Sequence, residues 1–173
     1  MKARDKVKTA LEVKEICDTA RQRGLQTVFT NGCFDLLHIG HVRYLELARD
    51  QGDMLVVGVN SDASVRKIKG PLRPLTPEQE RSELVAALHC VDHVVLFDTP
   101  DPLPLIELLQ PAVLVKGADW PLDRIVGADV VCRAGGRVVR APLMPEASTT
   151  GIIERIMNRF KENASVHREE SRE

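Results

Sequence analysis

The chain has 173 residues, of which 43% are hydrophobic and 28% charged, the profile of one globular domain with a single core. Its formal net charge of -1 gives no overall attraction to nucleic acid or to an anionic membrane, and one Trp, one Tyr and four Phe are too few for a surface that stacks nucleic-acid bases. No apolar run is long enough to span a membrane and the first residues lead into no signal segment, so we expect a cytoplasmic protein that binds neither nucleic acid nor membrane.

Hydrophobic periodicity divides the chain into three parts. Residues 1–25 are predicted to form an N-terminal helix, which Gly24 would end. Residues 26–160 carry a regular alternation of apolar runs and helical patterns, and we interpret them as the main domain. Residues 161–173 are charged and have almost no apolar side chains, so we expect a disordered tail.

Five apolar runs in the main domain have the length and the flanking turn residues of buried strands. These runs are Thr27–Thr30, Met54–Val59, His93–Phe97, Val113–Lys116 and Arg137–Val139. Segments with helical periodicity alternate with them. The predicted helices are His41–Gln51, one that begins at a Thr76 cap, Asp101–Leu109, Ala128–Ala134 and Ser148–Phe160, the last capped by Ser148. The alternation predicts an α/β fold, with a Rossmann-like five-stranded parallel sheet and helices on both faces.

In such a sheet, ligands bind beyond the carboxyl ends of the strands, and the segment after the first strand is suited to an anion. Gly32 lets the backbone approach a ligand, the first amides of the following helix attract negative charge, and Gly40 removes a side chain that would block a phosphate. His38 and His41 are three residues apart and lie on one side of the helix start. Two histidines near a helix start are more often structural, but the two glycines and the strand end favour a functional site here.

Residues 32–41, Gly-Cys-Phe-Asp-Leu-Leu-His-Ile-Gly-His, closely resemble the signature of the HxGH nucleotidyltransferase superfamily. Members include glycerol-3-phosphate cytidylyltransferase and phosphopantetheine adenylyltransferase. The sequence contains neither Gly-x-Gly-x-x-Gly nor a Walker motif, so no dinucleotide or P-loop pattern competes with this resemblance. The likeness extends from about Gln26 to Arg159 and is greatest to the adenylyltransferase domains of bifunctional heptose kinase/adenylyltransferases of lipopolysaccharide core synthesis. It is carried also by Val59–Asp62, Lys69–Gly70, Arg73–Pro74, Val115–Asp119 and Ser148–Thr150.

The resemblance implies transfer of AMP from ATP to D-glycero-β-D-manno-heptose 1-phosphate, which gives ADP-heptose and pyrophosphate. It implies Mg2+ bound with ATP, and a homodimer or larger assembly. In-line attack on the α-phosphate demands positioning and charge stabilisation from the protein rather than a covalent nucleophile. Two alternatives remain: another substrate pair, such as CTP with glycerol 3-phosphate or a flavin-precursor phosphate, and a nucleotide-binding module without catalysis.

The resemblance also implies catalytic roles by position. His38 and His41 would hold the triphosphate and stabilise the charge that grows in the transition state, with Lys69 as the third catalytic residue. Lys67 and Lys69 fall within Lys67–Pro74, whose Gly and two Pro predict a loop, and the family carries a mobile basic loop over the phosphates. Without the motif, these lysines would be interpreted as a solvated loop.

The remaining residues expected to bind nucleotide or substrate match further positions of the family pattern. They are Thr30, Asn31, Gly32, Cys33, Phe34, Asp35, Gly40, Lys67, Arg73, Arg81, Lys116, Gly117, Asp119, Ser148, Thr149 and Thr150. The family uses the segment from Lys116 to Trp120 near the base and ribose, although Trp120 suits a core or an interface equally well. Asp35 is equally suited to capping a helix, and a Ser-Thr pair by itself is usually only a cap.

Two features count against a direct transfer of every family property. Cytidylyltransferase relatives carry an Arg and a Gly shortly before the Ser-Thr pair, whereas residues 143–147 here are Leu-Met-Pro-Glu-Ala. The spacing of His89, Cys90, Asp92 and His93 suggests a metal site, but these residues straddle a predicted helix end and strand start, which would scatter their side chains. We therefore expect no protein metal site, and Mg2+ bound mainly by the phosphates.

Overall fold

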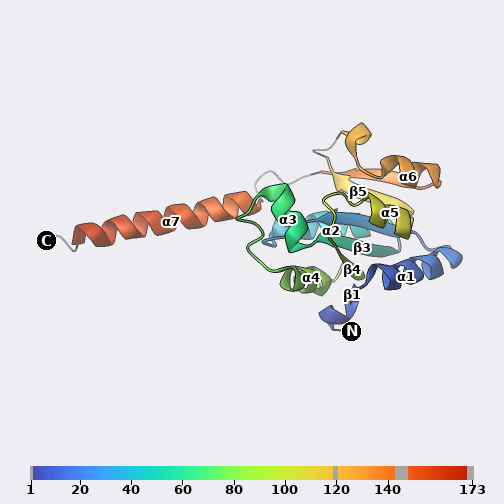
Figure 1. Ribbon diagram of the computed structural model, residues 1–173, viewed down its shortest axis with the longest axis horizontal. Coiled ribbons are helices and arrows are strands. Elements are labelled where there is room, and N and C mark those ends of the chain that lie inside the picture. The colour runs from blue at the N-terminus through green and yellow to red at the C-terminus, as the bar shows by residue number, and fades with distance from the viewer. Residues whose placement is uncertain (1, 119–120, 143–147, 171–173) are drawn as a thin grey trace.

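A computed structural model of the chain describes residues 2–118, 121–142 and 148–170, in which strands and helices alternate (Figure 1). Every neighbouring pair of strands is parallel, and the order across the sheet is β1-β4-β3-β2-β5-β6. The strands are β1 (Val7–Lys8), β2 (Thr27–Gly32), β3 (Met54–Asn60), β4 (His93–Phe97), β5 (Val113–Gly117) and β6 (Arg137–Ala141). This is the predicted α/β class, and β2 to β6 coincide with the five predicted strands.

The sixth strand, β1, corrects the predicted count of five. It lies at the edge of the sheet beside β4 and follows a 3-10 helix, η1 (Ala3–Lys6). A strand of two residues is too short to leave a periodic pattern in the sequence. A side chain helps to hold β1 beside β4, because Lys6 Nζ donates a hydrogen bond of 2.7 Å to the carbonyl of Val91, shortly before β4. The N-terminal segment therefore contains more than the helix α1 (Ala10–Gln22).

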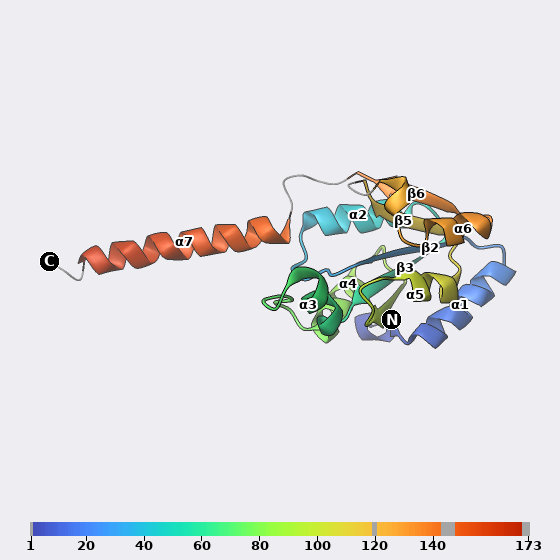
Figure 2. The ribbon, with the colours of Figure 1, turned by 45° about the horizontal axis from the view of Figure 1, so that its top comes forward.

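Helices cover both faces of the sheet, as the two views of the ribbon show (Figures 1 and 2). Apolar side chains of α2 and α4 pack on one face, and those of α1, α5 and α6 pack on the other. The helices after α1 are α2 (Ile39–Arg49), α3 (Asp62–Lys69), α4 (Glu78–Ala87), α5 (Leu103–Leu109), α6 (Ala128–Arg133) and α7 (Thr149–Glu170). A second 3-10 helix, η2 (Leu122–Arg124), precedes α6.

The central strand β3 shows why both faces need a cover. Leu55 and Val57 pack with α2 and α4, whereas Val56 between them packs with α1 and α5. Successive side chains of a strand point to opposite faces, so a continuous apolar run requires helices on both sides. Gly58 interrupts the run because a Cβ there would lie 3.0 Å from the ring of Phe29 on the neighbouring strand.

Two segments between β3 and α4 differ from their predictions. The segment Lys67–Pro74 is only partly a loop, because α3 continues to Lys69, and Ser61 caps it by accepting a 3.2 Å hydrogen bond from the amide of Ser64. The sequence predicts only the loop in this region, and α3 is an additional helix that begins at the Ser61 cap directly after β3. In α4 the cap position is Pro77 rather than the expected Thr76.

The last helix, α7, extends away from the sheet (Figures 1 and 2) and is longer than predicted. Its backbone is helical to Glu170 rather than to about Phe160, and so enters the segment expected to be a disordered tail. The tail prediction depends on low apolar content, but Lys, Glu, Ala and Arg in this segment have high helix propensity. In the described part of the chain, no helix combines the length and the apolar content that a membrane span needs.

The core makes a stability prediction. Leu114, fully buried on β5, should destabilise the fold by about 2–5 kcal/mol when changed to Ala, because the substitution removes buried methyl groups and leaves a cavity. The exposed Leu72 provides the matched control, and Leu72→Ala should change stability by about 0.5 kcal/mol or less. Urea unfolding followed by circular dichroism measures both values. Equal losses for the two variants would contradict the assignment of the core.

Candidate active site

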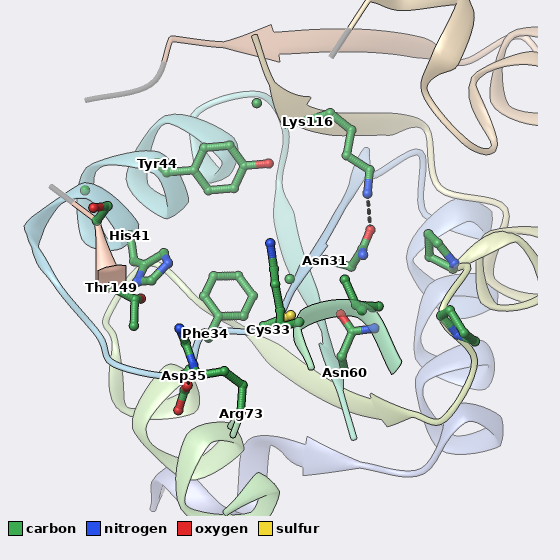
Figure 3. A pocket seen from close by; sticks show the side chains of 18 of the residues that line it. Asn31, Cys33, Phe34, Asp35, His41, Tyr44, Asn60, Arg73, Lys116 and Thr149 are labelled. Carbon is green, nitrogen blue, oxygen red and sulfur yellow. Dashed lines mark hydrogen bonds and ion pairs between the residues drawn. The ribbon is translucent and has the colours of Figure 1, made fainter. Parts of the chain in front are cut away.

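The carboxyl ends of the strands open into a cleft of about 890 Å³ (Figure 3). Residues that follow β2, β3, β4, β5 and β6 all contribute to its walls. The position agrees with the expectation that a ligand binds beyond this edge of a parallel sheet. The cleft brings together most of the predicted site residues, namely Asn31, Gly32, Cys33, Phe34, Asp35, His38, Gly40, His41, Lys69, Arg73, Lys116, Gly117, Ser148, Thr149 and Thr150.

The two histidines lie against each other at the start of α2. Their ring centroids are 3.8 Å apart and the ring planes differ by 22°, so one phosphate group can reach both. The helix starts at Ile39, earlier than predicted, because His38 has extended backbone and serves as the N-cap. The first amides of α2 therefore lie beside the imidazoles, and Gly40 at this turn also lines the cleft.

The turn between β2 and α2 places the ring of Phe34 against His41. Phe34 has a φ of 47°, a conformation that non-glycine residues rarely adopt, and its ring is buried. The ring meets His41 edge-on, with centroids 5.2 Å apart. Gly32 makes room for this arrangement, because a Cβ at that position would lie 3.0 Å from the Phe34 ring. The absence of a side chain at Gly32 therefore also allows the Phe34 ring to contact His41.

Burial keeps both imidazoles neutral at pH 7. Loss of water, together with the smaller effect of the neighbouring His38, lowers the pKa of His41 to about 4. Burial also lowers the pKa of His38. Within the described residues, the Nδ1 atom of each ring is buried without a hydrogen-bond partner.

Asp35 lines the cleft, where its carboxylate already has partners within the protein. Its carboxylate is almost fully buried, forms an ion pair with Arg73, and accepts hydrogen bonds of 2.7 and 2.9 Å from the amides of Leu75 and Thr76. Arg73 lines the cleft as predicted, with its Nε committed to Asp35.

Arg81, expected to contact substrate, is a correction. Its side chain is completely buried and does not line the cleft. It donates to the carbonyls of Cys33, Asn60 at 2.8 Å and Thr76 at 2.9 Å, and forms an ion pair of 2.8 Å with Asp62. The sequence pattern identifies an arginine near the site but does not reveal that its donors are used within the protein.

Two further predicted residues do not line the described cleft, and a third lies outside the described residues. Thr30 is fully buried behind its wall, where its hydroxyl shares a 2.7 Å hydrogen bond with Tyr44. Lys67 is exposed on α3 and lies outside the residues that line the cleft. Side chains three or four positions apart share a helix face, whereas Lys67 and Lys69 are only two positions apart and therefore point to different sides of α3. Asp119 lies outside the described residues, as do Trp120 and residues 143–147.

The start of α7 forms one end of the cleft, with Ser148, Thr149 and Thr150 among the lining residues. Ser148 caps the helix as predicted, since its Oγ accepts a 3.0 Å hydrogen bond from the amide of Gly151. Thr149 Oγ1 lies 3.5 Å from the carbonyl of Leu36, which joins this helix start to the turn that precedes His38. Figure 3 shows Thr149 and His41 on the same side of the cleft.

Lys116 and Asn31 lie together away from Thr149 (Figure 3). The Nζ of Lys116 donates to Oδ1 of Asn31, and these two side chains come from the neighbouring strands β5 and β2. Burial lowers the pKa of Lys116 to about 8, opposed by the negative charge of Asp101. Lys69, at the end of α3, is exposed and has no ion pair among the described residues.

The sequence interpretation missed several residues that line the cleft. Tyr44 is one helical turn after His41, and its hydroxyl donates a 3.1 Å hydrogen bond to the carbonyl of Val115. The i, i+3 spacing from His41 is the signal that identifies it. Asn60 is the last residue of β3, and its position at the carboxyl end of a strand is the signal that could have identified it. Arg124, from η2, has no comparable signal in the sequence.

Within the described residues, no group of three or more His, Cys, Asp or Glu side chains is arranged to hold a metal ion. The buried carboxylate nearest the histidine turn, Asp35, is already committed to Arg73 and two backbone amides.

Comparisons with known proteins place this cleft in a family. A family model described as cytidylyltransferase-like matches residues 29–155, which include both histidines and the start of α7. The chain belongs to the cytidylyltransferase-like family. Over 157 residues it is 52% identical to the bifunctional protein HldE of Syntrophotalea carbinolica and to that of Geobacter sulfurreducens, a match that covers 91% of this chain and 32% of each relative. The chain thus spans about a third of the length of these curated relatives.

Solved structures agree with this assignment. A lipopolysaccharide core biosynthesis protein from Thermoplasma volcanium is similar with a TM-score of 0.58 and 29% identity, over 70% of this chain and 98% of that one. A pantoate-beta-alanine ligase from Francisella tularensis has a TM-score of 0.53 at 12% identity, over 84% of this chain and 69% of that chain. This second likeness shows that the cytidylyltransferase-like family shares its fold with the ligase.

The neutral histidines predict a pH titration. The imidazole signal of His41 in nuclear magnetic resonance spectra should titrate near pH 4 in the free protein, because burial opposes its charged form. His41→Asn, which removes the signal, gives its assignment. The unfolded chain takes up this proton near 6.5, so His41 should stabilise the fold less as the pH falls from about 6.5 to about 4. Titration near 6.5 in the free protein would contradict the buried geometry.

Proposed function

We propose that the chain transfers AMP from ATP to D-glycero-β-D-manno-heptose 1-phosphate and produces ADP-heptose and pyrophosphate. The observation that carries this proposal is the pair of stacked imidazoles at the start of α2, inside a cleft at the carboxyl ends of the strands. Membership of the cytidylyltransferase-like family and 52% identity to bifunctional HldE proteins support the reaction class and the heptose substrate.

The proposed reaction is a single displacement at phosphorus. An oxygen of the sugar phosphate forms a bond to the α-phosphorus of ATP, and the bond from that phosphorus to the oxygen bridging the α- and β-phosphates breaks. Pyrophosphate leaves with the bonding electron pair. The nucleophile and the leaving group lie roughly in line, on opposite sides of the α-phosphorus.

Each part of the cleft has a role in this displacement. His38 and His41 donate hydrogen bonds to the α-phosphate, and such donors are each worth about 3 kcal/mol when they are aimed at developing charge. Lys69 and the first turn of α7, with Thr149 and Thr150, bind the departing pyrophosphate. The neutral imidazoles suit this role because a buried donor without its own charge adds no repulsion to the nearby lysines.

We propose that Mg2+ arrives with ATP and neutralises charge on its phosphates. The described residues offer no cluster of protein ligands, so the phosphate oxygens would supply most of the coordination. With ATP and a sugar phosphate as the proposed substrates, we propose that the reaction takes place in the cytoplasm. A homodimer or larger assembly remains a proposal from the family resemblance, and gel filtration with light scattering tests it.

Catalysis by the histidines predicts a specific loss. His41→Ala should lower kcat on the order of a hundredfold or more with the fold intact, because it removes a donor to the α-phosphate. His89→Ala is the matched control, since His89 is exposed and does not line the cleft. Phosphate released from pyrophosphate by an added pyrophosphatase measures turnover. A folded His41→Ala enzyme with near wild-type turnover would show that the motif is not catalytic.

Substrate choice is a separate prediction. We expect higher kcat/KM for ATP than for CTP, and for heptose 1-phosphate than for glycerol 3-phosphate. A pocket built to bond several sugar hydroxyls leaves its polar groups unpaired with a smaller acceptor, which is a strong source of discrimination. A panel of four nucleotides and several phosphorylated acceptors, at one Mg2+ concentration, tests this. Efficient use of CTP with glycerol 3-phosphate, and none of heptose 1-phosphate, would favour the alternative substrate pair. Binding of ATP without any turnover would favour the non-catalytic module.

A further inference from the structure

The cleft has a second cationic region on the side away from Thr149. Lys116 lies at the end of β5, and Arg124 follows in η2 on the same connection. Lys116 donates to the neutral amide oxygen of Asn31, and neither cation has an ion-pair partner within the described chain. The other arginine of the cleft, Arg73, is in contrast committed to Asp35. Asp101 also lines the cleft and its negative charge acts on Lys116, but no described ion pair joins it to either cation, so the described residues neutralise this region only in part.

A partly buried ammonium group without a carboxylate partner is unfavourable in the free protein. Burial accordingly lowers the pKa of Lys116 to about 8. A bound dianion would offset this cost, whereas the uncharged base and ribose of a nucleotide would not. The chemistry that fits Lys116 is therefore a phosphate rather than the base and ribose that the family resemblance implies for this segment.

The geometry of the proposed displacement decides which phosphate this is. Thr149 and His41 lie on one side of the cleft, and Lys116 with Asn31 lies on another (Figure 3). If pyrophosphate leaves toward the first turn of α7, the nucleophile must approach the α-phosphorus from the opposite side. Lys116 is on the side that this requirement leaves for the nucleophile, and Arg124 of η2 lines the same cleft.

We propose that Lys116, assisted by Arg124, binds the phosphate group of the acceptor and orients it toward the α-phosphorus of ATP. The assignment rests on the proposed nucleotidyl transfer and adds the location of the acceptor end. Asn31 fixes the ammonium group of Lys116 from β2, the strand that leads to the histidines. The two substrates thus meet over the neighbouring strands β2 and β5.

The test is a comparison of KM values in Lys116→Gln and Arg124→Gln. Each variant should raise KM for the sugar phosphate by about tenfold or more and leave KM for ATP within about twofold, because each removes a charge-assisted contact to the acceptor alone. Lys116→Arg, which keeps the charge, should recover part of the loss. Arg133→Gln is the matched control, because Arg133 is exposed on α6 and pairs with Asp129 outside the cleft.

Binding without turnover provides a second readout. Calorimetric titration with α,β-methylene-ATP, whose α–β bridge cannot be cleaved, should give similar affinities for wild type and Lys116→Gln. Titration of heptose 1-phosphate into the analogue complex should be at least about tenfold weaker for the variant. A rise in KM for ATP with unchanged acceptor KM, or no change in either, would overturn the proposal and return Lys116 to the nucleotide or to a structural role.

Failure of the proposed function gives a different result. If the wild type uses another phosphorylated acceptor, the heptose assignment is wrong, and the same split between acceptor and ATP is expected with that acceptor. If the wild type binds the ATP analogue but takes no phosphorylated acceptor from the panel, both proposals are overturned.

Discussion

The guanidinium group of Arg81 ties together the segments on which the cleft depends. It donates hydrogen bonds to the carbonyls of Cys33, Asn60 and Thr76, which follow β2, end β3 and precede α4, and it pairs with Asp62. Taking such a charge out of water costs several kcal/mol, and only a nearly complete set of acceptors offsets that cost. The three segments must therefore reach their positions together. Loss of one partner would leave a buried charge uncompensated and would disturb the floor of the cleft.

Burial also affects the protonation of the histidines in the cleft. Phe34 occupies a strained backbone conformation and presses the edge of its ring against His41, which excludes water from one side of the imidazole. The same contact lowers the fraction of His41 that is charged, because a buried imidazolium loses hydration. Packing and protonation are thus linked through one turn, and Gly32 makes the turn possible by leaving room for the Phe34 ring.

The sequence was informative where a residue's role follows from its place in the chain. Strands β2 to β6, the Ser148 cap and the position of His38 and His41 follow from periodicity, capping chemistry and the order of strand and helix. Roles that depend on distant partners could not be inferred. Arg81 was expected to face substrate, yet its partners lie 5 to 48 positions away. Asp35 likewise contacts residues about 40 positions further on. The edge strand β1 was missed because two residues cannot establish a period.

The charge of the cleft also depends on the fold rather than on the order of residues in the chain. The net charge of -1 excludes a strong overall field, yet Lys69, Lys116 and Arg124 reach one cleft from three separate places in the chain. Of the described carboxylates that line it, Asp35 is neutralised by Arg73, which leaves these three cations facing Asp101. In a partly enclosed space such an excess attracts anions more strongly than it would on an open surface, since less water screens it. An almost neutral chain can therefore attract anions at one site, because the parallel strands bring its cations to one edge.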